Sequence, residues 1–233
     1  MKKLGVIIPR YAHEVRIDKI TDEAIRQVLK VAELDTHIYV IDNGSTIQFS
    51  NQSDKVRYTR WDINRGVAPA WNEGWRQATN ADFLCWLNAD VIVEVGWDKA
   101  LCIAAEQLDC VAMPFTNGEK SDGVGITGWC FLTRRDIAAR IGAFDESFAP
   151  AYYEDTDWFH RAIQENIPLV NVPMANVMHT RMKGGTETAP WFKNRNLLHM
   201  ANRYRYAWKH DVSVESPPAF WRHPLPDVEF DSV

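Results

Sequence analysis

Short apolar runs rich in β-branched residues alternate with helical patterns through the first half of the chain. Strand-like runs occupy residues 6–8, 38–41, 56–61 and 83–87. Between the first and second runs, and again between the third and fourth, apolar residues recur at helical spacing. This alternation is typical of βαβ units. It predicts an α/β fold with a mostly parallel sheet flanked by helices.

Helical and strand-like patterns continue beyond residue 90. Helices are predicted at 97–108, around 136–141, from near 155 and within 190–209, and strands at 110–113, 128–133 and 169–172. Residues 118–128 are polar and contain four glycines, so they are predicted to form a mobile loop. We predict a single domain over residues 1–182, a basic aromatic helical extension over 183–211, and a proline-rich acidic tail over 212–233.

Composition and charge narrow the class of protein. A length of 233 residues with 46% apolar residues allows a large core, and a net charge of −5 argues against a chain that coats nucleic acid. The four cysteines lie in apolar stretches without metal-type spacing, so we expect buried free thiols in a reducing compartment. The chain shows no signal-peptide pattern and no run near the roughly 20 apolar residues of a membrane span. We expect a cytoplasmic protein without a transmembrane segment, with peripheral contact at a membrane left open.

Polar residues follow three of the predicted strands at the points where the apolar runs stop. They are Pro9 to Tyr11 after the first strand, Asp42 to Ser45 after the second, and Asn88 to Asp90 after the fourth. In an open α/β sheet, ligands bind outside the carboxyl ends of the strands. Each segment alone is compatible with an ordinary turn or helix cap. Together they predict one crevice lined from three strand ends.

The same crevice lacks the glycine-rich loops that usually bind phosphates. No G-x-G-x-x-G pattern follows the first strand, and no Walker-type G-K-S/T occurs in the chain. A bound diphosphate would therefore need a cation. Asp90 offers a carboxylate oxygen of the kind that Mg²⁺ and Mn²⁺ prefer, usually together with the phosphate oxygens of the substrate.

Six segments in order along the chain carry a resemblance to a known family. They are residues 6–9 (VIIP), 42–45 (DNGS), 64–68 with 72–74 (NRGVA and NEG), 87–90 (LNAD), 142–146 (GAFDE), and 154–157 with Arg161 (EDTD). Together they resemble the motifs of family 2 glycosyltransferases, which have the GT-A fold. The resemblance implies a Rossmann-like mixed sheet, mostly parallel and flanked by helices. The likeness is nearest to the rhamnosyltransferase-like branch and covers about residues 4–182.

The resemblance implies a donor site for a nucleotide-diphosphate sugar. Asp42 matches a residue that accepts a hydrogen bond from the nucleobase, with Pro9 and Arg10 framing the base. Donor contacts are further expected from Asn64, Asn72, Asn88 and Asp90. The Asn88-Ala89-Asp90 segment matches the Asp-x-Asp element of the family, in which Asp90 would bind the metal. Asn88 departs from the more common first aspartate of that element.

The resemblance also implies the chemistry of transfer. Asp155 matches the catalytic base, which removes the proton of the acceptor hydroxyl as that hydroxyl attacks the anomeric carbon. His179 matches a histidine that completes the metal site with Asp90, for Mn²⁺ or Mg²⁺. Trp129 and Glu154 are expected on the acceptor side. Structural roles remain open for these residues: Asp155 as part of an acidic helix start, His179 as a core histidine, and Trp129 as a packing residue.

These expectations favour an inverting glycosyltransferase that acts on a glycan or lipid-linked glycan. Three alternatives remain: transfer to hydroxylated bases of nucleic acid, a sugar-phosphate nucleotidyltransferase, or a non-catalytic module that binds nucleotide sugars. The nucleotidyltransferase is disfavoured because residues 10–13 (RYAH) after the first strand contain no glycine. The non-catalytic module is disfavoured because Asp42, Asp90, Asp155 and His179 are all present.

The C-terminal extension combines basic and aromatic residues. No acidic residue occurs between Thr188 and His210. The basic residues of this stretch are Lys193, Arg195, Arg203, Arg205 and Lys209. Aromatic residues are interleaved with them: Trp191, Phe192, Tyr204, Tyr206 and Trp208. Leu197, Ala201, Tyr204 and Trp208 recur at helical spacing and form an apolar stripe. One interpretation is a helix that packs its aromatic residues on the domain and leaves a basic face in solvent. The other is a platform for an anionic partner, either an acidic or lipid-linked glycan at a membrane surface or modified nucleic acid.

Overall fold

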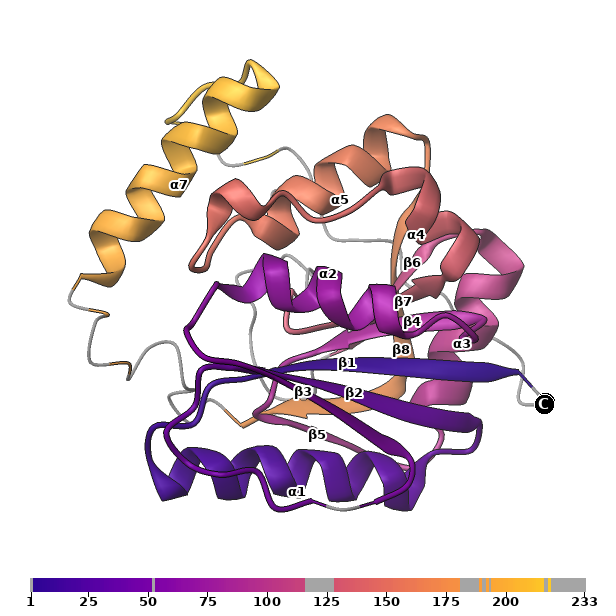
Figure 1. Ribbon diagram of the computed structural model, residues 1–233. Helices are drawn as coiled ribbons and strands as arrows, with labels where there is room; N and C mark the ends of the chain where they lie inside the picture. The colour runs from indigo at the N-terminus through magenta and orange to yellow at the C-terminus, as the bar shows by residue number, and fades with distance from the viewer. Residues whose placement is uncertain are drawn as a thin grey trace.

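A computed structural model describes residues 2–51, 53–115, 128–180, 189, 192, 194–215 and 218 of the chain. Its elements, in order, are β1 (Lys3–Arg10), α1 (Val15–Val31), β2 (Asp35–Asn43), β3 (Val56–Trp61), α2 (Val67–Gln77), β4 (Phe83–Leu87), β5 (Val91–Val93), α3 (Trp97–Leu108), β6 (Val111–Phe115), β7 (Cys130–Arg134), α4 (Arg135–Ile141), the short 3₁₀ helix η1 (Glu146–Phe148), α5 (Glu154–Gln164), β8 (Leu169–His179) and α7 (Arg195–His210). Helices cover both faces of a central sheet, and α7 lies at the periphery beside α5 (Figure 1).

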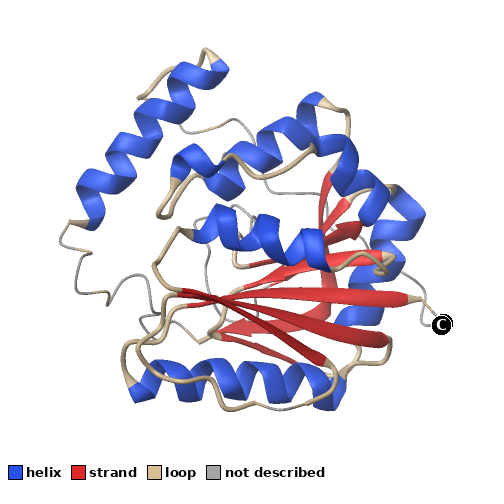
Figure 2. Cartoon of the chain, in the orientation of Figure 1, coloured by secondary structure: helices blue, strands red, loops and turns tan. Residues whose placement is uncertain are grey.

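The described strands form one eight-stranded sheet in the order β3-β2-β1-β4-β7-β6-β8-β5. The β3-β2-β1-β4 half is parallel throughout, as the alternating pattern of the first half predicted. In the other half β7 runs antiparallel to both β4 and β6, β8 is parallel to β6, and β5 is antiparallel to β8. The sheet is therefore mixed (Figure 2), and the expectation of a mostly parallel sheet holds only for its first half.

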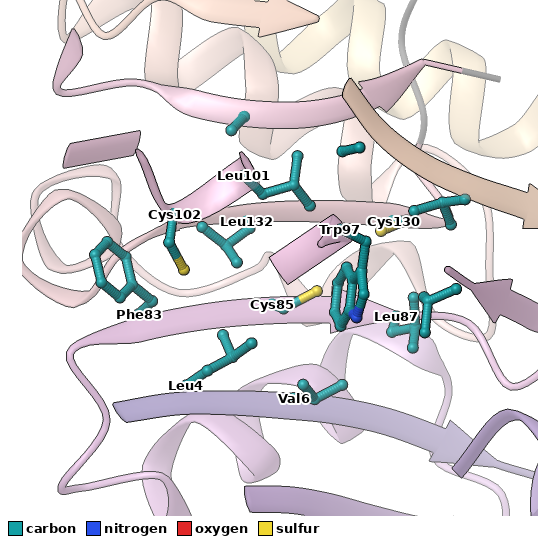
Figure 3. Close-up of a cluster of buried hydrophobic side chains, with 14 of the residues drawn as sticks. Leu4, Val6, Phe83, Cys85, Leu87, Trp97, Leu101, Cys102, Cys130 and Leu132 are labelled. Carbon is teal, nitrogen blue, oxygen red and sulfur yellow. The ribbon is translucent and has the colours of Figure 1, made fainter. Parts of the chain in front are cut away.

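Two hydrophobic layers hold the helices to the sheet. On one face, α1 and α3 pack against the strands through residues such as Ile25, Val28 and Leu101. Figure 3 shows part of this layer, with Trp97 of α3 lying among buried strand residues. On the other face, α2, α4 and α5 pack through an aromatic cluster that includes Trp71 and Trp158. Burial of these residues provides most of the favourable free energy of folding.

The four cysteines are free and buried, as expected from their apolar surroundings. Burial raises the pKa of the Cys85 and Cys102 thiols well above the usual range and that of Cys110 to about 12. These thiols stay protonated at neutral pH and behave as small apolar side chains.

The sequence predicted only residues 169–172 of strand β8, because Pro173 interrupts the strand pattern there. The strand in fact continues to His179. The register between β6 and β8 shifts at that point: Pro114 pairs with Val172, but Phe115 pairs with Asn176. Beyond this bulge, β8 continues to His179 and pairs with β5, placing Val91 opposite His179. The three residues of β5 were not predicted as a strand, because so short a run has no periodicity to detect.

Several predicted segments lie outside the described residues. These are the glycine-rich loop apart from Gly128, the residues Trp191 and Lys193 of the extension, and most of the tail beyond residue 215. No helix in the described part of the chain is both long and apolar enough to span a bilayer.

Candidate active site

A cleft of about 650 Å³ lies at the carboxyl ends of β1, β2 and β4. The residues after these strands meet there as predicted, with Pro9 to Tyr11, Asn43, and Asn88 to Asp90 all in its wall. Of the predicted site residues, those that line the cleft are Pro9, Arg10, Asn64, Asn88, Asp90, Trp129, Glu154, Asp155 and His179. Asp42 and Asn72 are not among its lining residues.

Asp90 and His179 meet at one end of the cleft through the pairing of β5 with β8. The Nε2 atom of His179 lies 3.1 Å from Oδ1 of Asp90. The backbone of Asp90 is fixed as well, because its carbonyl accepts hydrogen bonds from the amide and the hydroxyl of Thr180, at 3.0 and 2.9 Å. The ring of Trp129 stacks on that of His179, with a centroid distance of 5.2 Å and an interplanar angle of 11°. The imidazole is thus held between a carboxylate and an indole face.

The Asp90–His179 pair has the chemistry of a partial metal site. A carboxylate oxygen and an imidazole nitrogen are ligands for Mn²⁺, and Mg²⁺ is usually held by one or two carboxylates together with substrate phosphates. Within the described residues, no group of three or more His, Cys, Asp or Glu side chains is arranged to hold an ion. A cation here would therefore depend on oxygen atoms from a bound ligand or water. Asn88 also lines the cleft wall. Its backbone N–H donates a hydrogen bond to the backbone carbonyl of Trp129 at 2.8 Å.

Glu154 and Asp155 begin helix α5 and line another part of the cleft wall. Oε2 of Glu154 is buried without a hydrogen-bond partner. Burial, and then the neighbouring charge of Asp155, raise the pKa of Glu154 well above its usual range. Asp155 is partly exposed to the cleft, and its Oδ1 accepts hydrogen bonds from the amide and hydroxyl of Thr156, at 2.6 and 3.2 Å. Desolvation by the surrounding protein still raises the pKa of Asp155.

Asp42 lies beneath the cleft as the centre of a buried polar cluster. Its Oδ1 accepts a hydrogen bond from the amide of Ser45 at 2.8 Å. Its Oδ2 accepts from the guanidinium of Arg10 and from the hydroxyl of Tyr58, the latter at 2.6 Å. Burial and this bond to Asp42 raise the pKa of Tyr58 to about 12. Both carboxylate oxygens are thus engaged by the protein, and the structure does not place Asp42 against an open nucleobase pocket as the resemblance implied.

Arg10 connects this cluster to the cleft wall. Its Nη2 donates to Oδ1 of Asp18 at 2.6 Å and to the carbonyl of Ile47 at 2.8 Å. The side chain is fully buried, and its Nε has no hydrogen-bond partner. Arg10 is therefore held in place by two carboxylates.

Asn72, predicted as a donor contact, lies in a contact between α2 and the segment that precedes α5. Its Nδ2 donates to the carbonyl of Phe144 and to a carboxylate oxygen of Glu146, and its Oδ1 accepts from the amide of Phe144, each at 2.9 Å. The side chain ties α2 to the segment between α4 and α5. Both N–H groups of its side-chain amide are used in this contact, which gives the residue a structural function.

Two asparagines shape the loop between β3 and α2. Asn64 lines the cleft, and its Oδ1 accepts a hydrogen bond from the amide of Gly66 at 2.9 Å. Asn43, which belongs to the polar segment predicted after the second strand, also lines the cleft. Its Oδ1 accepts from the amide of Arg65 at 2.6 Å, and its Nδ2 donates to the carbonyl of Gly66 at 2.9 Å. Asn43 thus holds the loop against the end of β2.

Residues before α5 and from α7 also line the cleft; among them, only Arg195 was singled out from the sequence, as part of the basic extension. Tyr152 and Tyr153 both have left-handed backbone conformations, with φ of 75° and 73°. Arg195 and His199 reach the cleft from α7, and the guanidinium of Arg195 lies 5.5 Å from the centre of the Tyr152 ring. Burial, followed by the charges of neighbouring arginines, lowers the pKa of His199. The consecutive tyrosines just before Glu154 were the signal in the sequence for Tyr152 and Tyr153.

Helix α7 contacts the domain through Asn202, Tyr206 and Ala207, together with Lys209 and His210, and not through its predicted apolar stripe. Lys209 forms ion pairs with Asp145 at 2.7 Å and with Asp157 at 2.6 Å, and His210 lies 2.8 Å from Asp157. Of the predicted aromatic contacts, Tyr206 is buried. The stripe residues Leu197, Tyr204 and Trp208 instead remain 63%, 56% and 86% exposed. Ion pairs and hydrogen bonds to η1 and α5 select this orientation.

Comparison with known proteins was made on sequence and on structure. A family model described as "Glycosyl transferase family 2" matches residues 5–134, more than half of the chain. No curated protein matches the sequence. Among solved structures, one of GalNAc-T7 with UDP, GalNAc and Mn²⁺ is similar, with a TM-score of 0.69 at 15% identity. The match covers 90% of this chain and 49% of that chain, so the present chain spans about half of the protein it resembles. At this identity the likeness shows a shared fold.

Proposed function

Since the chain belongs to glycosyl transferase family 2, we propose that it moves a sugar from a nucleotide-diphosphate sugar to an acceptor hydroxyl, with inversion at the anomeric carbon. The observation that supports this proposal is the pairing of two sites in one cleft. The Asp90–His179 pair is suited to the diphosphate, and the Glu154–Asp155 pair is suited to the acceptor. Inverting transfer needs these two functions on either side of the reacting carbon.

Asp155 is proposed as the base that accepts the proton of the acceptor hydroxyl. Its raised pKa makes the carboxylate a stronger base than an exposed aspartate. The hydrogen bonds from Thr156 engage Oδ1. They leave Oδ2 as the oxygen that would take the proton. Glu154, whose pKa is raised further, would stay protonated over a wider pH range and donate a hydrogen bond to the acceptor.

Asp90 and His179 are proposed to hold Mn²⁺ or Mg²⁺ at the diphosphate. When bound, the cation would stabilise the negative charge that develops on the departing nucleoside diphosphate. Trp129 would keep the His179 ring oriented through the stacking contact, and the Thr180 bonds would keep Asp90 in place. Asn88 would add a neutral amide contact to the donor.

The nucleoside end is assigned to the cleft wall formed by Pro9, Arg10, Asn43 and Asn64. Asp42 would act there indirectly, by holding Arg10 and the turn at Ser45. Trp129, Tyr152 and Tyr153 provide aromatic surface on the acceptor side, which is suited to stacking against sugar rings. A glycan or a lipid-linked glycan is therefore the proposed acceptor.

A panel of nucleotide sugars tests this function, starting with UDP-sugars because the structural neighbour contains UDP. Binding is measured by thermal shift with and without Mn²⁺, and catalysis by slow hydrolysis of the donor, in which water replaces the acceptor. We expect one donor to stabilise the protein only with the cation and to be hydrolysed. Asp155→Asn should keep donor binding and lose hydrolysis, whereas the exposed Asp54→Asn should change neither. Failure of every donor to bind or react would overturn the proposal.

A further inference from the structure

Asn202 of α7 contacts the backbone of the loop that leads into α5. Its Nδ2 lies 2.8 Å from the carbonyl oxygen of Phe148, 2.9 Å from that of Ala151 and 3.0 Å from that of Tyr152. The side chain is 1% exposed. One buried amide group thus gathers three carbonyl groups of a five-residue segment.

The carboxamide of Asn202 is itself held in a defined orientation. Its Oδ1 accepts a hydrogen bond from Nη1 of Arg205 at 2.9 Å, and the same nitrogen donates to the carbonyl of Ser147. This arrangement points the amide nitrogen toward the loop, because the guanidinium can only donate. Arg205 and Asn202 therefore act on the segment from Ser147 to Tyr152 as one unit.

The loop held in this way has an unfavourable backbone conformation. Tyr152 and Tyr153 are consecutive residues with left-handed backbone conformations, which residues other than glycine rarely adopt. Such a conformation persists only where surrounding contacts impose it, and it is often found at functional sites. From the other side, the amide of Val67 at the start of α2 donates to the carbonyl of Pro150 at 2.9 Å. The loop is thus fixed between α2 and α7.

The residues that follow this loop are the acidic pair of the cleft. Glu154 and Asp155 come directly after Tyr153, so the direction in which α5 starts sets where both carboxylates lie. We propose that Asn202 is a positioning residue for the transfer step: by bonding the carbonyls of Phe148, Ala151 and Tyr152, it imposes the left-handed turn that places Asp155 in the cleft. This inference rests on the proposed function only in assigning Asp155 as the base.

Other contacts of α7 hold the helix against the domain, so the effect of Asn202 on the loop can be measured separately from the attachment of the helix. Tyr206 is buried against Phe148 and Tyr153, and Lys209 pairs with Asp145 and Asp157 (Figure 1 shows α7 beside α5). These contacts do not involve the amide group of Asn202. Its removal should therefore leave α7 in place while freeing the loop.

The test compares Asn202→Ala and Asn202→Asp with Asn196→Ala, a matched change at an exposed position of the same helix. Aspartate keeps the size of the side chain but replaces the donor by an acceptor facing three carbonyls. Hydrogen–deuterium exchange reports on the loop without any need for activity. We expect amides of residues 151–157 to exchange at least tenfold faster in both Asn202 variants, with exchange in α3 and in residues 204–210 unchanged.

The catalytic readout is hydrolysis of the donor found in the nucleotide-sugar panel, alongside titration with UDP and Mn²⁺. The turnover rate should fall at least tenfold in both Asn202 variants, while UDP binding stays within twofold of the parent. The acidic limb of the pH–rate profile should move to lower pH, because water reaching Asp155 removes the desolvation that raises its pKa. A purely structural function would not move this limb.

Unchanged exchange in the loop would overturn the inference, whatever the activity. Faster exchange combined with unaltered turnover and an unaltered pH profile would also overturn it, since the loop would then not position the base. If the parent protein binds and hydrolyses no donor, the proposed function fails together with the catalytic part of this inference. The exchange measurement would still decide whether Asn202 holds the loop.

Discussion

The backbone of Gly128 lies directly against the carboxylate of Asp155: a Cβ atom built on Gly128 would come within 1.7 Å of the Oδ2 atom. No side chain fits in this space, and the nearest atom is the proposed proton acceptor itself. Gly128 comes just before β7, whereas Asp155 lies in the first turn of α5, so two distant segments meet at the proposed base.

Gly128→Ala should displace the Asp155 carboxylate and reduce donor hydrolysis by about 100-fold, the loss expected for a misplacement of about 1 Å. Binding of UDP with Mn²⁺ should stay unchanged, because the Asp90–His179 pair is not touched. Turnover and titration calorimetry on the same variant check both parts. A variant with full turnover would contradict the assignment of Oδ2 as the proton acceptor.

Glu154 should make the protein less stable as the pH rises. Its folded-state pKa is raised, so between the unfolded pKa near 4.5 and the folded pKa the native state binds more protons, and the free energy of unfolding falls with increasing pH. Each unit by which folding raises the pKa of Glu154 corresponds to about 1.4 kcal/mol in the free energy of unfolding. Urea unfolding of Glu154→Gln should show a gain over the parent that grows from pH 4.5 upward and vanishes below it. A gain independent of pH would contradict this.

Asp90→Asn and His179→Ala should each weaken Mn²⁺ binding in the presence of UDP. The loss should exceed the roughly 10–100-fold typical of changes to groups that only support a ligand. Thermal shifts measured against Mn²⁺ concentration provide the comparison, with Asp54→Asn as the exposed control. If both variants retain the Mn²⁺-dependent shift, the cation binds elsewhere.

Asp42→Asn should act mainly on stability. The change breaks one of the two ion pairs of the buried Arg10 and leaves Asp18 as its remaining acidic partner, so the cost should lie at the lower end of that for a broken buried pair, about 3 kcal/mol. Tyr58→Phe removes only one neutral donor to the same carboxylate and should cost about 1 kcal/mol. Chemical denaturation of the two variants separates these values. A stable Asp42→Asn variant that no longer binds donor would instead support direct recognition of the nucleobase.

Lys209→Ala should lower stability at neutral pH by about 1 kcal/mol, since the ion pairs with Asp145 and Asp157 are partly exposed at the lysine. Although burial acts in the opposite direction, the Lys209 and Ser147 hydrogen bonds lower the pKa of Asp145 from 3.8 to about 2. Stabilisation of the Asp145 carboxylate is therefore complete above pH 3.8 and is lost as the pH falls toward 2. The difference from the parent should shrink over this window, and Lys99→Ala serves as the exposed control.

Strand ends were the part of the site that the sequence predicted best. Asn88 and Asp90 follow an apolar run that has to be buried, so their place at the sheet edge follows from local pattern alone. The parallel half of the sheet followed from the same alternation. Asp155 and His179 came instead from ordered motifs, and the pairing of β5 with β8 explains how His179 reaches Asp90.

Choices among long-range polar partners were not predictable. The carboxylate of Asp42 has the same local sequence whether it faces a nucleobase or Arg10, and only the packing of β1 beside β2 decides. Helix α7 shows the same limit. Its apolar stripe predicts an inward face, but acidic residues of distant segments, Asp145 and Asp157, attract its basic side.

The pairing of β5 with the end of β8 also bears on the order in which the chain matures. Asp90 is made 89 residues before His179, so a growing chain holds half of the site until its last strand has been added to the sheet edge. An ion that needs both side chains binds only after β8 has paired with β5, and its binding then stabilises the paired state over the unpaired one. A bound ion would therefore report that β8 has joined the sheet, a step that can come before α7 has been made.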